Sequence, residues 1–161
     1  MGTVAYTVEQ ALEKMRHFCA YQERCHGEVR LRLRAFPLDA EELEMVVSRL
    51  IEDDFLNEDR FAVAFAGGKF RMLQWGRVRI RYELKRKGVS DYNIRKGLTA
   101  IDDGEYLRVL DHLVEGKWAS EKRRSGDEGT RRRRVAAYLV QKGYEPDLVW
   151  EAVGRLSSGR P

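Results

Sequence analysis

Apolar residues recur along this chain in a pattern that repeats about every 50 residues. When Gly88 is aligned with Gly143, apolar positions coincide: Ile80 with Val135, Leu84 with Leu139, Ile94 with Val149 and Leu98 with Val153. When Gly88 is aligned instead with Pro37, the matches are Ile80 with Val29, Leu84 with Leu33, Val89 with Leu38, Ile94 with Leu43, Leu98 with Val47 and Ile101 with Leu50. Apolar positions kept in register around a helix-breaking residue indicate a tandem array of supersecondary units.

Each copy contains a segment whose secondary structure is ambiguous. Residues 29–34 and 78–84 alternate between apolar and polar side chains, which taken singly is typical of a half-buried strand. The third copy, residues 131–143, lacks the alternation but has apolar side chains at helical spacing, at Val135, Tyr138 and Leu139. The positions that all copies share are four residues apart, so we interpret all three segments as helices.

Helix boundaries follow from capping residues and helix breakers. Predicted starts lie at Thr7 with Gln10 as a capping box, Asp39, Asn57 followed by Glu58 and Asp59, Ser90, Asp102-Asp103 and Glu145-Pro146. Predicted stops lie at Pro37, Gly88 and Gly143. The sequence therefore predicts an all-α fold of three tandem three-helix repeats, at 1–54, 55–101 and 102–161. Residues Ser125 to Thr130, with two glycines, are expected to form a flexible loop.

Charge is distributed unevenly along the 161 residues. The formal net charge is only +4, but acids predominate between Asp39 and Arg60 and bases between Lys69 and Lys96. Such polarity favours a basic surface for a polyanion or an acidic protein, and a solvated helix face is the alternative. No apolar run is long enough to span a membrane, and no signal-peptide pattern is present. Two cysteines, Cys19 and Cys25, make no disulfide framework, so we expect a cytoplasmic protein.

The basic residues supply the candidate binding site. On the helix at 74–87, Arg77, Arg81 and Lys85 form one row, and arginine forks suit phosphate or carboxylate recognition. The aromatic residues Phe70, Trp75 and Tyr82 are interleaved as nucleic-acid stacking requires, although core packing is favoured for Phe70 and Trp75. Arg131 to Arg134 oppose a helix dipole, which an anionic partner or a frayed, solvated terminus explains. The expected partner-binding residues are Lys69, Arg71, Arg77, Arg79, Arg81, Lys85, Arg86, Arg131, Arg132, Arg133 and Arg134.

Residues for catalysis or metal binding are not found in a productive pattern. Gly68-Lys69 resembles part of a phosphate loop, but Val63 stands at the first glycine position and Phe70 replaces the Ser/Thr. The cysteines near His17 and His26 are six residues apart and form no CxxC pair. We therefore expect no enzyme activity, no metal and no cofactor.

The run Phe55-Leu56-Asn57-Glu58-Asp59-Arg60-Phe61-Ala62 resembles the hallmark of the RecX family, F-L-(D/N)-(D/E)-x-R-F-A. Trp75-Gly76-Arg77, Ile80, Leu84, Lys87-Gly88-Val89 and Ile94 continue the family pattern, and looser similarity extends from Thr7 to Leu156. The resemblance implies structural roles for Phe55, Leu56, Arg60, Phe61, Trp75, Gly76 and Gly88. One departure is Gly67-Gly68, where relatives more often carry a charged residue. Two glycines weaken a helix by roughly 1–2 kcal/mol relative to alanines, which puts the continuity of this helix in question.

For fold and function, the resemblance implies an elongated, curved, right-handed-type array of three-helix repeats. It also implies a monomeric regulator, active in recombination, DNA repair and the SOS response. Such a protein binds the filament of the RecA recombinase on single-stranded DNA and inhibits ATP hydrolysis, strand exchange and co-protease activity, with single-stranded DNA as a secondary contact. The alternative hypothesis is a stand-alone helical DNA-binding module, whose affinity would fall steeply with salt.

Overall fold

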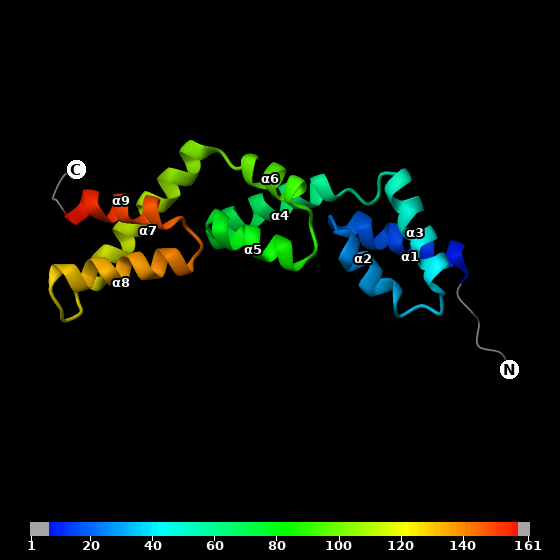
Figure 1. Cartoon of the computed structure of the whole chain (residues 1–161), viewed down its shortest axis with the longest axis horizontal. Helices are drawn as coiled ribbons and strands as arrows, with labels where there is room; N and C mark the ends of the chain where they lie inside the picture. Colours follow the sequence, from blue (N-terminus) through cyan, green and yellow to red (C-terminus); the bar gives the residue numbers. More distant parts are fainter. Residues whose placement is uncertain (1–6, 158–161) are drawn as a thin grey trace. The chain divides into compact units, whose positions relative to one another are not determined.

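The computed structural model describes residues 7–157, which form nine α-helices and no strand (Figure 1). The helices are α1 (Val8–Tyr21), α2 (His26–Leu33), α3 (Ala40–Glu52), α4 (Glu58–Leu73), α5 (Arg77–Arg86), α6 (Asp91–Thr99), α7 (Asp103–Glu121), α8 (Glu128–Gln141) and α9 (Pro146–Ser157). The all-α prediction is confirmed, and the three ambiguous segments are helical, as α2, α5 and α8. None of these described helices is both long and apolar enough to cross a bilayer.

Most of the residues predicted to start helices form N-capping hydrogen bonds in the structure. Thr7 and Gln10 form a reciprocal capping box, and Asp39 does the same with Glu42. Asn57 accepts a hydrogen bond from the Arg60 amide, and Asp102 accepts one from the Glu105 amide. Each cap satisfies a backbone N–H that the first helical turn leaves without a partner.

The two predicted glycine stops have the expected conformation. Gly88 has φ +81° and Gly143 has φ +107°, the left-handed region that glycine enters without a steric penalty. Helix α4 runs without interruption through Gly67-Gly68, so the two glycines do not break it.

The loop expected at 125–130 lies three residues earlier, at 122–127 between α7 and α8. Helix α8 already begins at Glu128, because Asp127 caps it by accepting a hydrogen bond from the Thr130 amide at 2.7 Å. Thr130 therefore lies in the first helical turn. The same cap places Arg131 to Arg134 after the acids Asp127 and Glu128, so the four arginines do not occupy the bare helix terminus.

The chain divides into two compact units, one of Met1–Phe65 with Leu84–Gly97 and one of Ala66–Glu83 with Leu98–Pro161. The repeat boundaries inferred from the sequence stay predictions, and their outermost residues, 1–6 and 158–161, lie outside the described residues.

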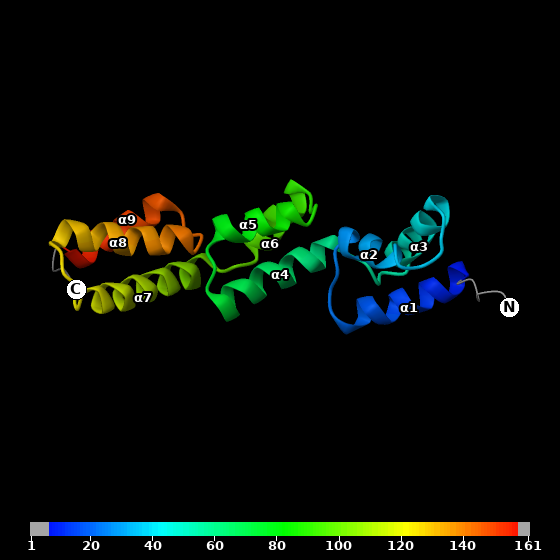
Figure 2. The ribbon, with the colours of Figure 1, turned by 90° about the horizontal axis from the view of Figure 1, so that it is seen from below.

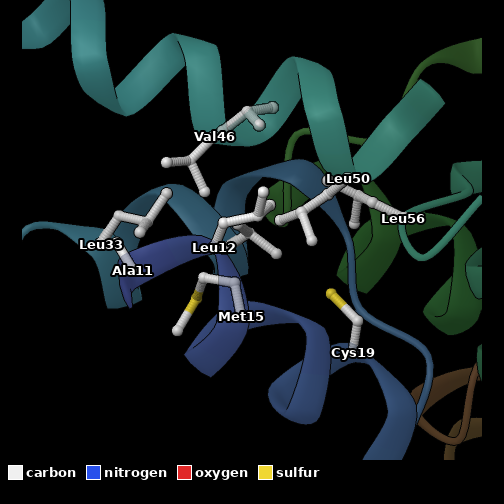
Figure 3. Close-up of a cluster of buried hydrophobic side chains, with 10 residues drawn as sticks. Ala11, Leu12, Met15, Cys19, Leu33, Val46, Leu50 and Leu56 are labelled. Carbon is white, nitrogen blue, oxygen red and sulfur yellow. The ribbon is translucent and has the colours of Figure 1, made fainter. Parts of the chain in front are cut away.

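In the first unit, α1 and α2 both pack against α3 (Figure 2). Figure 3 shows Val46 and Leu50 of α3 facing Leu12 and Met15 of α1. Helix α2 has only 8 residues, and isolated helices shorter than about 12–15 residues are marginal in water. Burial of its Val29 and Leu33 in this cluster, at about 1.5–3 kcal/mol per side chain, therefore holds α2 in its helical form.

In the second unit, α7, α8 and α9 pack against one another, side by side in both views (Figures 1 and 2). The core side chains come from all three helices and from the joining turn, and they include Tyr106, Leu110, Val135, Leu139, Tyr144 and Val149. Phe70 is buried in this unit too, and its ring centre lies 5.7 Å from that of Tyr106. The expectation that Phe70 packs in the core is confirmed.

Candidate partner-binding surface

The N-terminus of α5 is held by backbone groups from the turn between α8 and α9. The Gly76 amide donates to the Lys142 carbonyl at 3.0 Å, and the Val78 amide donates to the Gly143 carbonyl at 2.9 Å. This approach is so close that a Cβ added to Gly76 would lie 2.2 Å from the Gly143 carbonyl carbon. Position 76 therefore requires glycine, which is the physical reason for its place in the motif.

Arg77 is fixed inside the second unit. Its guanidinium donates to Glu145 at 2.9 Å and to Asp103 at 2.7 Å, and it lies 3.8 Å above the centre of the Tyr106 ring. Its backbone amide donates to the Tyr106 hydroxyl at 3.0 Å. Although Arg77 was predicted from the sequence as a partner contact, its hydrogen-bonding groups are used within the molecule.

Two tyrosines complete this network. The Tyr106 hydroxyl donates to Glu145, and the Tyr144 hydroxyl donates to the Gln74 carbonyl at 2.9 Å. Burial raises the pKa of both phenols, and the neighbouring Glu145 carboxylate raises it further. Both side chains therefore act as neutral hydrogen-bond donors. The sequence carried no signal for them, because their partners lie 39 and 70 residues away.

Lys69 and Arg79 are brought together on one indole ring. The Lys69 ammonium lies 5.2 Å and the Arg79 guanidinium 4.2 Å from the centre of the Trp75 ring. Trp75 is half-buried, so the ring supports both cations while one part of it stays accessible. The three residues form a cation–aromatic cluster that resembles the interleaving expected from the sequence.

Arg71 and Arg81, like Arg79, are exposed cations of the second unit's α4 and α5 segments. Both are solvent-exposed and neither pairs with a carboxylate among the described residues. In the first unit, Lys85 and Arg86 are also exposed, and Lys85 lies 3.7 Å from Asp91. Of the predicted set on α4 and α5, Arg71, Arg79 and Arg81 thus pair with no carboxylate among the described residues, and Arg79 lies against the Trp75 ring.

Arg131 to Arg134 all make contacts within the second unit. Arg131 lies 5.0 Å from the centre of the Trp118 ring, Arg132 lies 3.7 Å from Glu128, and Arg133 donates to the Thr130 hydroxyl. Arg134 donates to the Ser125 carbonyl at 2.8 Å. The cluster is therefore partly neutralised, and the contacts order its side chains.

Glu121 lies buried beside this cluster, although the sequence gave no reason to single it out. Its side chain is 3% exposed and lies within 3.8 Å of Lys117, Arg124 and Arg134. Burial acts to raise the pKa of Glu121, but the cations Arg124 and Lys117 outweigh it and the net shift is downward. The carboxylate is thus kept charged and anchors the basic segment that follows α7.

The remaining motif residues support the start of α4. Leu56 and Phe61 are buried, and Phe55 packs against the core of the first unit. Arg60 donates to Glu23 at 2.9 Å and to the carbonyl of Asp54, a residue whose φ is +61°. These bonds hold the strained turn before α4 in place.

The histidines and cysteines near the N-terminus form no metal site. Among the described residues, no group of three or more His, Cys, Asp or Glu side chains is placed to hold a metal ion. Both thiols are buried, and this burial raises the pKa of Cys19 and of Cys25 to about 11. Cys25 donates a weak hydrogen bond to the Lys87 carbonyl at 3.8 Å.

Comparison with known proteins places these features in a family. Residues 57–98 match the second three-helix domain of RecX, and residues 104–153 match the third. Regulatory protein RecX of Trichlorobacter lovleyi is 32% identical over 122 residues, which cover 75% of this chain and 79% of that protein. Regulatory protein RecX of Prosthecochloris aestuarii is 27% identical over 91% of this chain and 93% of its own length. Other relatives of the same description are longer, and the chain covers 58% of the one from Clostridium acetobutylicum.

The fold agrees with these matches. The crystal structure of RecX from Lactobacillus salivarius superposes with a TM-score of 0.83 at 18% identity, over 94% of this chain and 97% of that one. The architecture therefore defines a tandem array of three-helix domains, as expected from the repeat. The chain belongs to the RecX family of regulatory proteins, which confirms the resemblance found in the sequence.

Proposed function

We propose that this protein binds the RecA filament on single-stranded DNA and inhibits its ATPase, strand-exchange and co-protease activities. The observation that carries the proposal is the match of both three-helix domains to RecX, in a chain similar to regulatory proteins of that description. We further propose that it acts in the cytoplasm as a monomer, where recombination, DNA repair and the SOS response take place.

Within the second unit, we assign filament contact to Arg71 and Arg81, together with the cations stacked on Trp75. Arg71 and Arg81 have no intramolecular carboxylate to release, so binding an acidic protein surface or a phosphate costs them only desolvation and side-chain entropy. Arg131 to Arg134 remain a second proposed contact, because ordered arginine forks suit bidentate recognition. We give Arg77 a structural role, since its charge already balances Glu145 and Asp103.

A direct test measures binding to RecA filaments assembled on a fluorescent oligonucleotide with a slowly hydrolysed ATP analogue, beside the bare oligonucleotide. We expect binding to the filament to be tighter. Equal binding to bare DNA, with roughly 10³-fold loss between 50 and 200 mM salt, would instead identify a stand-alone DNA-binding module.

The variant Arg81→Glu tests the assigned surface. We expect it to weaken filament binding about tenfold, equivalent to about 1.4 kcal/mol. Arg108→Glu on α7 is the matched control, because Arg108 is likewise exposed, lacks a carboxylate partner in the described chain and lies in the same unit. If both variants bind like the parent protein, or if both lose the same affinity, Arg81 is not part of the interface.

A further inference from the structure

An open groove of about 620 Å³ lies in the first unit, along α1 and α2 and the turns that follow them. Its lining combines cations with aromatic rings, chiefly Lys14, Phe18, Tyr21, Arg24, Arg32 and Phe36. The lining includes no acidic residue. The groove lies outside the two matched domains at 57–98 and 104–153, and none of its residues was singled out from the sequence as a binding residue.

Two arginines are preorganised in this groove. The Arg24 guanidinium lies 3.8 Å from the centre of the Phe18 ring, and its Nε donates to the Phe18 carbonyl at 3.0 Å. The Arg32 guanidinium lies 5.4 Å from the centre of the same ring. Contact with the same ring restrains both cations, which lowers the entropy lost when they bind an anion.

The charge of these arginines is not neutralised by neighbouring acids. Neither Arg24 nor Arg32 pairs with a carboxylate in the described part of the chain. The two nearest acids in sequence have other hydrogen-bond partners, since Glu23 accepts from Arg60 and Glu28 accepts from the Cys25 amide at 3.1 Å. The groove is therefore positively charged as well as aromatic.

Tyr21 stands at the edge of the groove as the last residue of α1, with 83% of its surface exposed. An exposed ring beside unpaired arginines matches the way single-stranded nucleic acids are bound, with bases stacked on aromatic rings and phosphates held by cations. An acidic peptide would use the cations but gain little from the flat ring surfaces. The volume of the groove is in the range of small-ligand sites and suits one or two nucleotides of a strand.

We propose that this groove binds single-stranded nucleic acid, with a base stacked on Tyr21 and the phosphates held by Arg24 and Arg32. The site goes beyond filament regulation and does not depend on it, because it requires only features of the first unit. It also adds an anion-binding surface separate in sequence from the cations of α4, α5 and α8.

The test uses the full chain without RecA. Anisotropy of a fluorescein-labelled oligo-dT is measured with Tyr21→Ala and Arg32→Glu, each beside a matched control. Tyr92→Ala is the control for Tyr21, since Tyr92 is also exposed and lies in the first unit. Arg34→Glu is the control for Arg32, because it makes the same charge change two residues along the chain, on the opposite side of the helix and outside the groove lining.

We expect Tyr21→Ala and Arg32→Glu each to lower the affinity about fivefold or more, as stacking of 1–3 kcal/mol per base implies, and both controls to stay within about twofold. Photocross-linking with 5-iodouracil in the oligonucleotide should label Tyr21 or Phe18. Equal losses for Arg32→Glu and Arg34→Glu, cross-links only on α5 or α8, or displacement of the strand by polyglutamate at the same charge concentration would overturn the proposal. Circular dichroism of each variant verifies that it is folded.

Discussion

At the residue scale, Arg77 is a cation whose contacts lie within the second unit and stabilise its fold. It stands at the N-terminus of α5, where a positive charge opposes the helix dipole. Asp103 and Glu145 offset that repulsion, and the Tyr106 hydroxyl satisfies the amide of the first helical turn. Removing any one of these groups leaves a donor or a charge without its partner.

Tyr106→Phe tests this network. The Arg77 amide and the Glu145 carboxylate would each lose a hydrogen bond, and we expect the free energy of unfolding to fall by about 1–3 kcal/mol. Urea denaturation measures the change. Tyr138→Phe is the matched control, because Tyr138 is 40% exposed and its ring contacts are with lysines. A loss in both variants, or in neither, would show that the hydroxyl network does not stabilise the unit.

At the element scale, the alignment of the repeats predicted the secondary structure correctly where the local sequence pattern did not. The alternation in 78–84 favours a strand, and only its alignment with α8 indicates a helix. The structure shows the physical reason, since Ile80 and Leu84 are fully buried, whereas Val78 and Tyr82, each two residues before one of them, are 46% and 61% exposed. The alternating residues therefore do not share a face, and positions four apart form the core.

Loop position was the element-scale feature that the sequence predicted poorly, since the loop covers 122–127 and not 125–130. The glycines and serine at 125–130 indicate a loop, but Asp127 captures the Thr130 amide and starts α8 inside it. Helix propensity alone does not predict where α8 begins, because the Asp127 cap stabilises a first turn that contains Gly129. Thr7 and Asp39 differ from Asp127 in that Gln10 and Glu42 complete a capping box three residues later, whereas Thr130 does not.

Alanine substitutions at Gly68 and Gly76 distinguish local from long-range effects on stability. A Cβ at Gly68 would meet no atom within 4 Å, so Gly68→Ala is expected to stabilise α4 and the whole chain by about 0.5–1 kcal/mol. Gly76→Ala would force the turn at Gly143 to move, and we expect a loss of at least about 1–3 kcal/mol. Thermal or urea unfolding distinguishes the two. Destabilisation by Gly68→Ala, or tolerance of Gly76→Ala, would contradict this account.

At the scale of the whole molecule, much of the charge polarity seen in the sequence is used within the units. Acids of the stretch 39–60 pair with bases of the first unit, as in Glu44 with Arg30, Asp54 with Arg60 and Asp59 with Lys96. The sequence therefore predicted where charge is concentrated, but not which charges stay available. Availability depends on residues far apart in the chain, and that is why the sequence alone did not indicate that Arg77 pairs with Asp103 and Glu145.

Each unit has cations that pair with no carboxylate among the described residues. Arg71 and Arg81 remain exposed in the second unit, and Arg24 and Arg32 line the groove of the first. The proposed regulator of a protein–DNA filament would meet both acidic protein surface and phosphate, and both groups of cations are proposed contacts. Family membership, the fold and the charge distribution thus support the same proposal.

The central claim is that this protein regulates RecA on single-stranded DNA, and the most direct measurement is the DNA-dependent ATPase rate of RecA while the protein is titrated in. We predict inhibition at ratios well below one protein per RecA, because a protein that blocks or caps a filament affects many subunits at once. An unchanged ATPase rate up to equimolar protein, alongside salt-sensitive binding to bare DNA, would contradict the account and leave a DNA-binding module with the RecX fold.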